Sequence, residues 1–159
     1  MESTLVGAPT QYLSFVLAGE EYAVDILRVQ EVRGWENATP LPNAPVYIKG
    51  VINLRGVVVP IVDLRARFGM EAVEYSKMTV VIVLRLHNGG RDRIVGVVVD
   101  AVSDVLDVND DQRKPAPDLG TSGQASFVHG MATIGDKMVI LLDVDHLLDA
   151  LADGDSAAS

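Results

Sequence analysis

Short runs of aliphatic and β-branched residues, each closed by turn residues, limit most strongly what this chain can fold into. Each run has the length of a β-strand and is bounded by Gly, Pro, Asn or Asp. Such runs also occur as parallel strands of α/β folds, but those folds need long amphipathic helices between the strands, which this sequence lacks. The sequence therefore predicts an all-β protein, with strands over Tyr12–Leu17, Val57–Val62, Thr79–Leu84, Ile94–Val99 and Met138–Leu142.

Two short helices are predicted beside these strands. Asp63 is placed to cap a helix over Leu64–Phe68. The stretch Ile26–Val32 fits either a strand or a helical turn. Asp143 is placed to cap a C-terminal helix, whose apolar face comprises Val144, Leu147, Leu148 and Leu151.

The chain contains an internal repeat. The segment Gly50–Leu64 resembles Gly130–Val144 at an offset of 80 residues, because each runs from a glycine through an apolar strand to an Asp followed by an aliphatic residue. A duplication predicts two similar small β-barrels, which share a seam that is a natural binding site. Chance similarity between apolar strands is the alternative. Two further pairs match at an offset of 75, namely Val24–Ile26 with Val99–Ala101 and Pro40–Pro42 with Pro115–Pro117.

Charge and composition exclude several classes of function. The 13 basic and 22 acidic residues give a net charge of −9. The phosphate groups of nucleic acids and of anionic membranes therefore repel the chain. The chain has no cysteine, which excludes disulfides, thiolate nucleophiles and cysteine-ligated zinc. With no secretory signal and no apolar stretch of about 18 residues, we expect a cytoplasmic protein without membrane insertion.

The sequence offers no motif for catalysis or metal binding. None of His87, His129 and His146 has a second histidine at metal-ligand spacing. The sequence contains neither a nucleophile elbow nor a phosphate-binding loop. The acidic segment from Asp104 to Asp111 lacks the spacing, central glycine and terminal glutamate of an EF-hand loop. We expect no enzymatic activity, no cofactor, no metal and no nucleic-acid partner.

Two charged residues stand in apolar surroundings. Arg55 precedes the most apolar strand, and Glu31 interrupts the apolar stretch Val29–Val32. Either Arg55 is a structural ion-pair partner, or it presents its guanidinium at a partner-binding surface, where arginine is enriched. A pairing of Glu31 with Arg55 is a hypothesis that rests on both charges standing in apolar runs.

Four stretches carry a resemblance that spans nearly the whole chain, namely Tyr22–Gly34, the highly specific Ile48–Arg65, Gly96–Val105 and Pro115–Pro117. In their sequence and order they resemble the CheW family of chemotaxis coupling, or adaptor, proteins. One departure is the hairpin Leu86–Arg93, which is longer than the family pattern and has an exposed tip at His87–Gly90.

The resemblance implies two similar five-stranded β-barrels of SH3- or OB-like type, packed together, with a C-terminal helix. It implies no catalysis and no cofactor. The implied partners are the cytoplasmic hairpin tip of chemoreceptors and the regulatory domain of the histidine kinase CheA. An apolar groove with one arginine at its edge suits a helix-in-groove contact. By resemblance, the receptor-binding residues are Ile26, Val29, Arg55, Val80, Val81 and Val105, and the kinase-binding residues are Val32, Arg33, Gly34 and Trp35.

The resemblance also implies boundaries and a location. We expect a CheW-like domain over residues 11–151, between a flexible N-terminus, 1–10, and a flexible tail, 152–159. We expect a cytoplasmic protein at membrane-associated receptor arrays. Two points stay open: whether copies of the chain join one another in rings, and whether the domain is instead a regulatory module of a larger or different two-component system. The sequence contains no receiver-like segment and no kinase nucleotide motif, which favours the adaptor.

Overall fold

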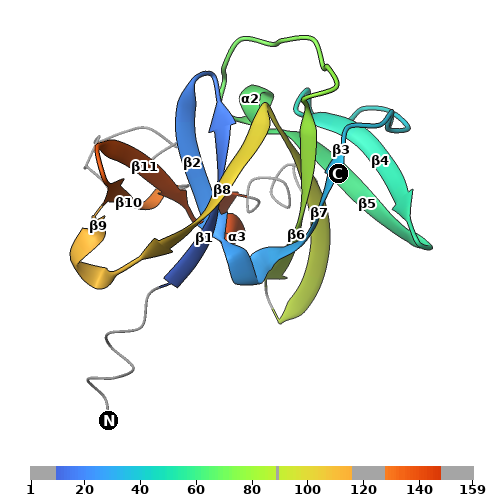
Figure 1. Cartoon of the computed structure of the whole chain (residues 1–159). Coiled ribbons are helices and arrows are strands. Elements are labelled where there is room, and N and C mark those ends of the chain that lie inside the picture. Colours follow the sequence, from blue (N-terminus) through green and yellow to red (C-terminus); the bar gives the residue numbers. More distant parts are fainter. Residues whose placement is uncertain (1–9, 89, 116–127, 148–159) are drawn as a thin grey trace.

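The computed structural model describes residues 10–88, 90–115 and 128–147, which form two sheets that lie side by side (Figure 1). Sheet A has six strands in the order β8-β1-β2-β11-β10-β9, and sheet B has five in the order β3-β6-β7-β5-β4. The elements are β1 Thr10–Leu17, β2 Glu20–Asp25, the 3-10 turn η1 Ile26–Arg28, β3 Val29–Gly34, β4 Ile48–Leu54, β5 Val57–Asp63, α2 Leu64–Arg67, β6 Val80–Asn88, β7 Arg91–Val99, β8 Ala101–Val108, the 3-10 turn η2 Asp110–Gln112, β9 Arg113–Lys114, β10 Val128–Ile134, β11 Lys137–Leu142 and α3 Val144–Leu147.

The predicted strands are confirmed, and they read as unbroken apolar runs because the sheets are covered on both faces. In β6, Ile82 and Leu84 face a core between the two sheets, whereas Val81 and Val83 face a core inside sheet B. Neighbouring residues of β1 and β7 alternate in the same way. A strand that serves two cores has no polar face, so its sequence loses the usual alternation.

Three apolar cores result from this arrangement. The seam core, between the sheets, is the largest and comprises Leu13, Phe15, Leu17, Tyr22, Val24, Val62, Leu64, Phe68, Ile82, Leu84, Leu86, Val95, Val97, Val99, Leu142 and Val144. The sheet-B core comprises Ile52, Leu54, Val59, Ile61, Val81, Val83 and Val98. The sheet-A core comprises Tyr12, Ala23, Val108, Ala132, Val139 and Leu141. The predicted seam is therefore filled by side chains, so a partner can use only its rim.

The two segments of the predicted repeat form hairpins with the same register. The β4–β5 hairpin has a register shift between the pairs Ile48–Val62 and Gly50–Ile61. The β10–β11 hairpin has the same shift between the pairs Val128–Leu142 and Gly130–Leu141, each residue lying 80 positions later. Chance similarity does not reproduce pairing partners and an irregularity together, so the two hairpins are repeats of one unit.

Both repeated hairpins need glycine where another segment crosses them. A Cβ on Gly50 would lie 2.2 Å from the carbonyl oxygen of Thr39, and a Cβ on Gly130 would lie 2.8 Å from that of Lys114. Thr39 and Lys114 lie 75 positions apart, which is the upstream offset of the repeat. The close approach is thus a feature of the repeated unit.

Each half of the repeat contributes strands to both sheets. After the β1–β2 hairpin of sheet A, the chain crosses through η1 to β3, which pairs with β6 of sheet B. After the β6–β7 hairpin of sheet B, it crosses at Asp100 to β8, which pairs with β1 of sheet A. Sheet A therefore contains both ends of the described chain, and sheet B its middle.

The prediction of two five-stranded barrels needs correction. Within the described residues no ladder joins β8 to β9 or β3 to β4, so both sheets are open, and sheet A has six strands because β9 is added. What is confirmed is an all-β fold of two related sheets with short helices. The β6–β7 hairpin also occurs as predicted, since Asn88 pairs with Arg91.

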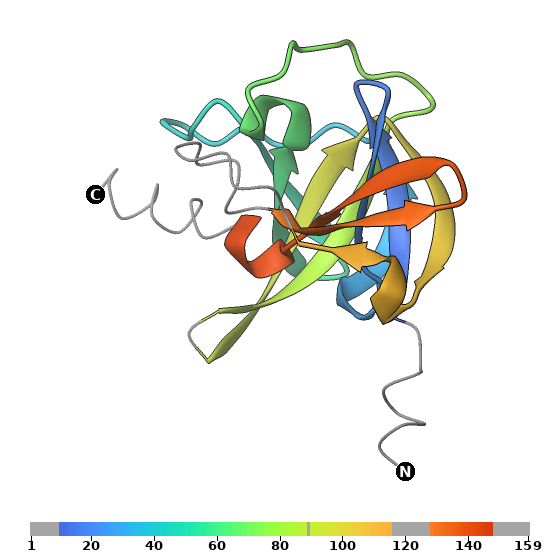
Figure 2. The same ribbon diagram turned by 90° about the vertical axis from the view of Figure 1, so that its left-hand side faces the viewer.

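The predicted short helices are single turns. The carboxylate of Asp63 accepts hydrogen bonds from the backbone nitrogens of Arg65 and Ala66 at the start of α2. The remainder of the predicted C-terminal helix lies outside the described residues, as do the segments 1–9 and 152–159. Figure 2 shows α2 and α3 on one side of the molecule and β8 on the other. None of the described helices has the length and apolar character that a bilayer-spanning helix needs.

Candidate partner-binding surfaces

One segment, Ile26–Trp35, carries residues of both predicted binding sets. Its first part is η1, where the Asp25 carboxylate accepts a hydrogen bond of 2.9 Å from the backbone nitrogen of Leu27. Its second part is β3, which within the described residues pairs only with β6 and so has a free edge. The ambiguous stretch after β2 is thus a helical turn followed by a strand, and the two predicted surfaces lie next to each other.

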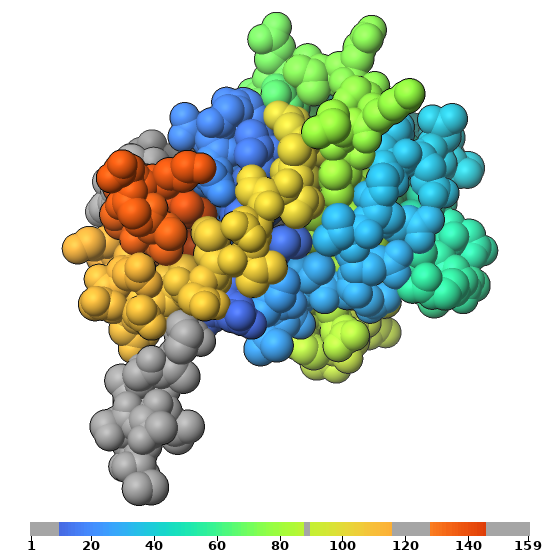
Figure 3. Space-filling view, in the orientation of Figure 1, coloured from blue at the N-terminus to red at the C-terminus, as the bar shows by residue number. Residues whose placement is uncertain are grey.

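Three of the predicted receptor-binding residues lie at the edge of the seam core, and a fourth is exposed on the neighbouring strand β8. Ile26, Val29 and Val80 are half-buried and pack against the seam core, and Val105 on β8 is 47% exposed. The elements that carry them are neighbours, because η1 packs against β1 and β6, and β8 pairs with β1. Figure 3 shows β8 in yellow and β3 in blue on one face of the molecule.

Val81 does not lie at this edge. It is 2% exposed and belongs to the sheet-B core. Because Val80 faces the seam, the alternation along β6 turns Val81 inward. Its side chain is therefore not available to a partner.

Arg55 stands at the tip of the β4–β5 hairpin. Its φ of 52° and the φ of 90° at Gly56 are those of a type I′ turn, which favours Asn, Asp or Gly rather than Arg at the first position. The Arg55 side chain is 68% exposed, and its Nη2 lies 2.5 Å from Oε1 of Glu31. The two charged groups that stood out in apolar surroundings are therefore in contact.

Glu31 binds a second arginine. Its Oε2 accepts a hydrogen bond of 3.1 Å from Arg33 Nη1. The hydrogen bonds from Arg55 and then from Arg33 hold the pKa of the Glu31 carboxyl below its ordinary value. One carboxylate thus joins a residue of the predicted receptor-binding set to a residue of the predicted kinase-binding set.

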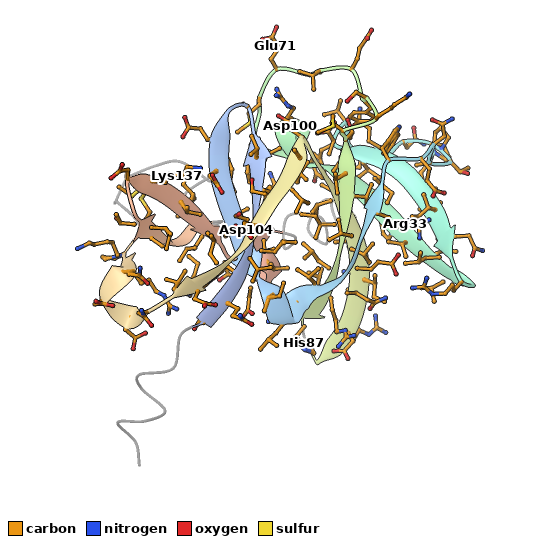
Figure 4. All side chains as sticks on the ribbon, viewed as in Figure 1. Arg33, Glu71, His87, Asp100, Asp104 and Lys137 are labelled. Carbon is orange, nitrogen blue, oxygen red and sulfur yellow. The ribbon has the colours of Figure 1, made fainter. Side chains whose placement is uncertain are left out.

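The predicted kinase-binding residues differ in how freely they face solvent. Val32 is 44% exposed and Gly34 is exposed, whereas Arg33, labelled in Figure 4, is also bound to Glu36 at 2.7 Å. Trp35 is half-buried, and its ring meets that of Tyr75 edge-on at 4.3 Å between centroids. Val32 is therefore the free apolar side chain of this set, and Trp35 anchors its end.

Sequence reasoning missed Tyr75, which holds the long loop before β6. Its hydroxyl donates to Oδ2 of Asp63, a carboxylate that is 6% exposed and also caps α2. Burial, and next the Asp63 carboxylate, raise the pKa of Tyr75 well above its ordinary value. The available signal was that Tyr75 is the single aromatic residue of the loop over residues 69–79.

A small cleft lies where β1, η1 and α3 meet. Its volume is about 230 Å³, and it is lined by Tyr12, Asp25, Arg28, His129, Leu142, Asp143, Val144 and Asp145. This is below the ~300 Å³ at which small-molecule pockets begin. Two of its charged groups, Arg28 and Asp145, bind each other. No three His, Asp or Glu side chains gather to hold a metal ion in the part of the chain that the structure describes.

An all-β fold with two neighbouring sets of exposed apolar and arginine side chains defines a protein-interaction module. Comparisons with known proteins are consistent with this class. A family model described as a CheW-like domain matches residues 11–152. The chemotaxis protein CheW of Klebsiella aerogenes is 47% identical over 140 residues, which are 88% of this chain and 82% of that protein.

Two further relatives extend the similarity to other bacteria and to a solved structure. The chemotaxis protein CheW of Rhizobium meliloti is 43% identical over 141 residues, 89% of this chain and 88% of that protein. The crystal structure of the scaffolding protein TtCheW from Thermoanaerobacter tengcongensis matches with a TM-score of 0.78 and 34% identity, and covers 89% of this chain and 93% of that one. The chain belongs to the CheW family, and it is a chemotaxis scaffold, or adaptor, protein.

Proposed function

We propose that this chain is a non-catalytic adaptor that couples the cytoplasmic hairpin tips of chemoreceptors to the histidine kinase CheA, in cytoplasmic arrays at the membrane. The observation that carries this proposal is the shared carboxylate of Glu31, which binds Arg55 and Arg33 at once. An adaptor must hold two partners in a fixed relation. Two binding sets that meet at one carboxylate are suited to that task.

The receptor-facing set comprises Ile26, Val29, Val80 and Val105, with Arg55 at its edge. A receptor tip is a helical hairpin, and an amphipathic helix binds by laying its apolar side chains against an apolar strip. Arg55 offers a planar fork of donors to a carboxylate or carbonyl at the rim of that contact. Val81, which is buried in the sheet-B core, makes no contact with the receptor.

The kinase-facing set comprises Val32, Arg33, Gly34 and Trp35. Val32 supplies exposed apolar area on the free edge of β3, and Trp35 fixes the end of that strand. We further propose that sheet B acts as a barrel-like lobe. Support comes from the contact between Arg55 at the β4–β5 tip and Glu31 on β3, which bridges the two open edges through side chains.

The proposal is tested by two matched variants. Val32 and Val105 are exposed to nearly the same degree, 44% and 47%, so a lysine at either place leaves the cores intact. We expect Val32→Lys to weaken binding of the CheA regulatory domain, and Val105→Lys to weaken binding of a receptor cytoplasmic fragment, each by about tenfold or more. Each variant keeps its affinity for the other partner. Calorimetry in which the wild-type chain binds neither partner contradicts the proposal.

A further inference from the structure

Two ion pairs hold the places where the chain crosses between the sheets. Arg65 on α2 donates from Nε and Nη2 to the two oxygens of Asp100, at 2.8 and 2.7 Å. Arg28 on η1 donates from Nη1 and Nη2 to the two oxygens of Asp145 on α3, at 2.9 and 2.8 Å. Arg65 and Asp145 lie 80 positions apart and so occupy the same place in the repeat. Each helical turn therefore holds one crossover in place. The turn α2 supplies the arginine of its ion pair, whereas α3 supplies the carboxylate of the other.

The Asp145 clamp ties together three elements. Oδ1 of Asp145 also accepts a hydrogen bond of 3.1 Å from the backbone nitrogen of His87, and Arg28 Nη1 also donates to the carbonyl oxygen of Arg85 at 3.2 Å. The hydrogen bonds that the Arg28 guanidinium donates to Asp145 raise its pKa. Figure 4 shows His87 and Asp100 at opposite ends of the molecule, so the two clamps are well separated. Bidentate Arg–carboxylate pairs fix geometry as well as adding energy.

The crossover that Asp145 holds presents an exposed apolar side chain. Leu27 is 82% exposed, between Ile26 and Val29, which pack against the seam core. On one side its backbone is fixed by Asp25, and on the other by the clamped Arg28. A leucine that is held rigidly in solvent, beside half-buried neighbours, suits an anchor that enters a partner's apolar pocket at little cost in ordering.

We propose that Asp145 is a positioning residue for receptor binding: through Arg28 it fixes η1, so that Leu27 contacts the receptor hairpin beside Ile26 and Val29. This inference rests on the proposed function. It places a residue from the far end of the described chain, 117 positions from Arg28, in control of the receptor-facing surface. Loss of the clamp leaves η1 to be ordered on binding, which lowers affinity for the receptor alone.

The test measures the affinity of the full chain for two purified partners, the receptor cytoplasmic fragment and the CheA regulatory domain from the same organism. We expect Asp145→Asn to weaken receptor binding about fivefold or more, with kinase binding within about twofold of wild type. Asp100→Asn removes the matched clamp at the other crossover and keeps both affinities. Asp145→Glu, which retains the carboxylate, recovers receptor binding. Leu27→Ala weakens receptor binding at an unchanged melting temperature.

Other outcomes separate the two proposals. If the wild-type chain does not bind the receptor fragment, the proposed function itself fails. If the wild-type chain binds and Asp145→Asn binds equally well, the positioning role is wrong. The role is also wrong if Asp145→Asn loses both partners in parallel, or if Asp100→Asn weakens receptor binding as much, because either result indicates a general loss of structure.

Discussion

At Arg55 the backbone conformation favours a residue other than arginine, whereas the proposed function needs the arginine side chain. Its φ of 52° lies in the left-handed region, which Gly, Asn and Asp adopt more readily than Arg. We expect Arg55→Asn to keep the turn, with a melting temperature within about 3 °C of wild type or above it. We expect the same variant to lose coupling of receptor to kinase. Thermal unfolding and a kinase assay measure the two effects.

A charge reversal at the same place complements that variant. Arg55→Glu sets two carboxylates against each other at Glu31, so coupling should fall while the circular dichroism spectrum stays that of the folded protein. An unfolded Arg55→Glu protein would contradict the surface role and show that Arg55 is a structural ion-pair partner.

Tyr75 makes stability depend on pH in the alkaline range. Its pKa in the folded protein is raised above the value of about 10 expected in the unfolded chain. The neutral hydroxyl therefore contributes stability that is fully present below pH ~10 and is lost as the pH rises further. We expect Tyr75→Phe to lose about 1–2 kcal/mol at pH 7 and to show a shallower alkaline fall in urea unfolding. A slope equal to that of wild type would contradict this role, although buried Tyr12 and Tyr22, whose pKa values are also raised, keep part of the fall in the variant.

At the scale of elements, Gly50 and Gly130 occupy matching places in the two hairpins, but the backbone at Gly50 tolerates a side chain less well. Gly50 combines a φ of 138° with a clash at 2.2 Å, whereas Gly130 has only a clash, at 2.8 Å. We expect Gly50→Ala to lower the free energy of unfolding by about 3 kcal/mol or more, and Gly130→Ala by less. Gly34→Ala is the control, because a Cβ there meets nothing within 4 Å. Equal midpoints in urea for all three variants would contradict the close approach.

Strands β1, β5, β6, β7 and β11 could be predicted from the sequence, but not which sheet each strand joins. Strand-length apolar runs indicated these strands correctly, and the offset of 80 matched two hairpins with the same register. That the chain leaves sheet A after β2 and returns to it at β8 could not be predicted, because the crossovers are η1 and the single residue Asp100, which carry no signal for one sheet over the other. Likewise, Arg28 and Asp145 are separated by 117 positions and pair only because the fold brings them together.

The proposed binding surface was predictable only where charge interrupts an apolar run. Glu31 and Arg55 stood out for that reason, and they lie in contact. Val81 was placed on the surface although it is buried, because a strand with apolar residues on both faces gives no sign of which residues point outward. Leu27 was missed for the same reason, since an exposed leucine inside an apolar run resembles its buried neighbours.

At the scale of the whole molecule, the two sheets should unfold as one unit. Each sheet contains strands from both halves of the repeat, and the largest core lies between the sheets. We expect Phe15→Ala, in the seam core and fully buried, to cost about 3–5 kcal/mol and to keep a single transition. Calorimetry that shows two transitions, one for each sheet, would contradict this view of the seam.

The central claim is that this protein couples the chemoreceptor to the kinase CheA, and one titration tests it most directly. Kinase autophosphorylation is measured with receptor-containing membranes and CheA held constant while this protein is added. The account predicts a large, saturable rise in phosphorylation that attractant suppresses, and no such rise with Arg55→Asn. Absence of any effect from the folded wild-type protein, with receptor and kinase taken from its own organism, would contradict the account.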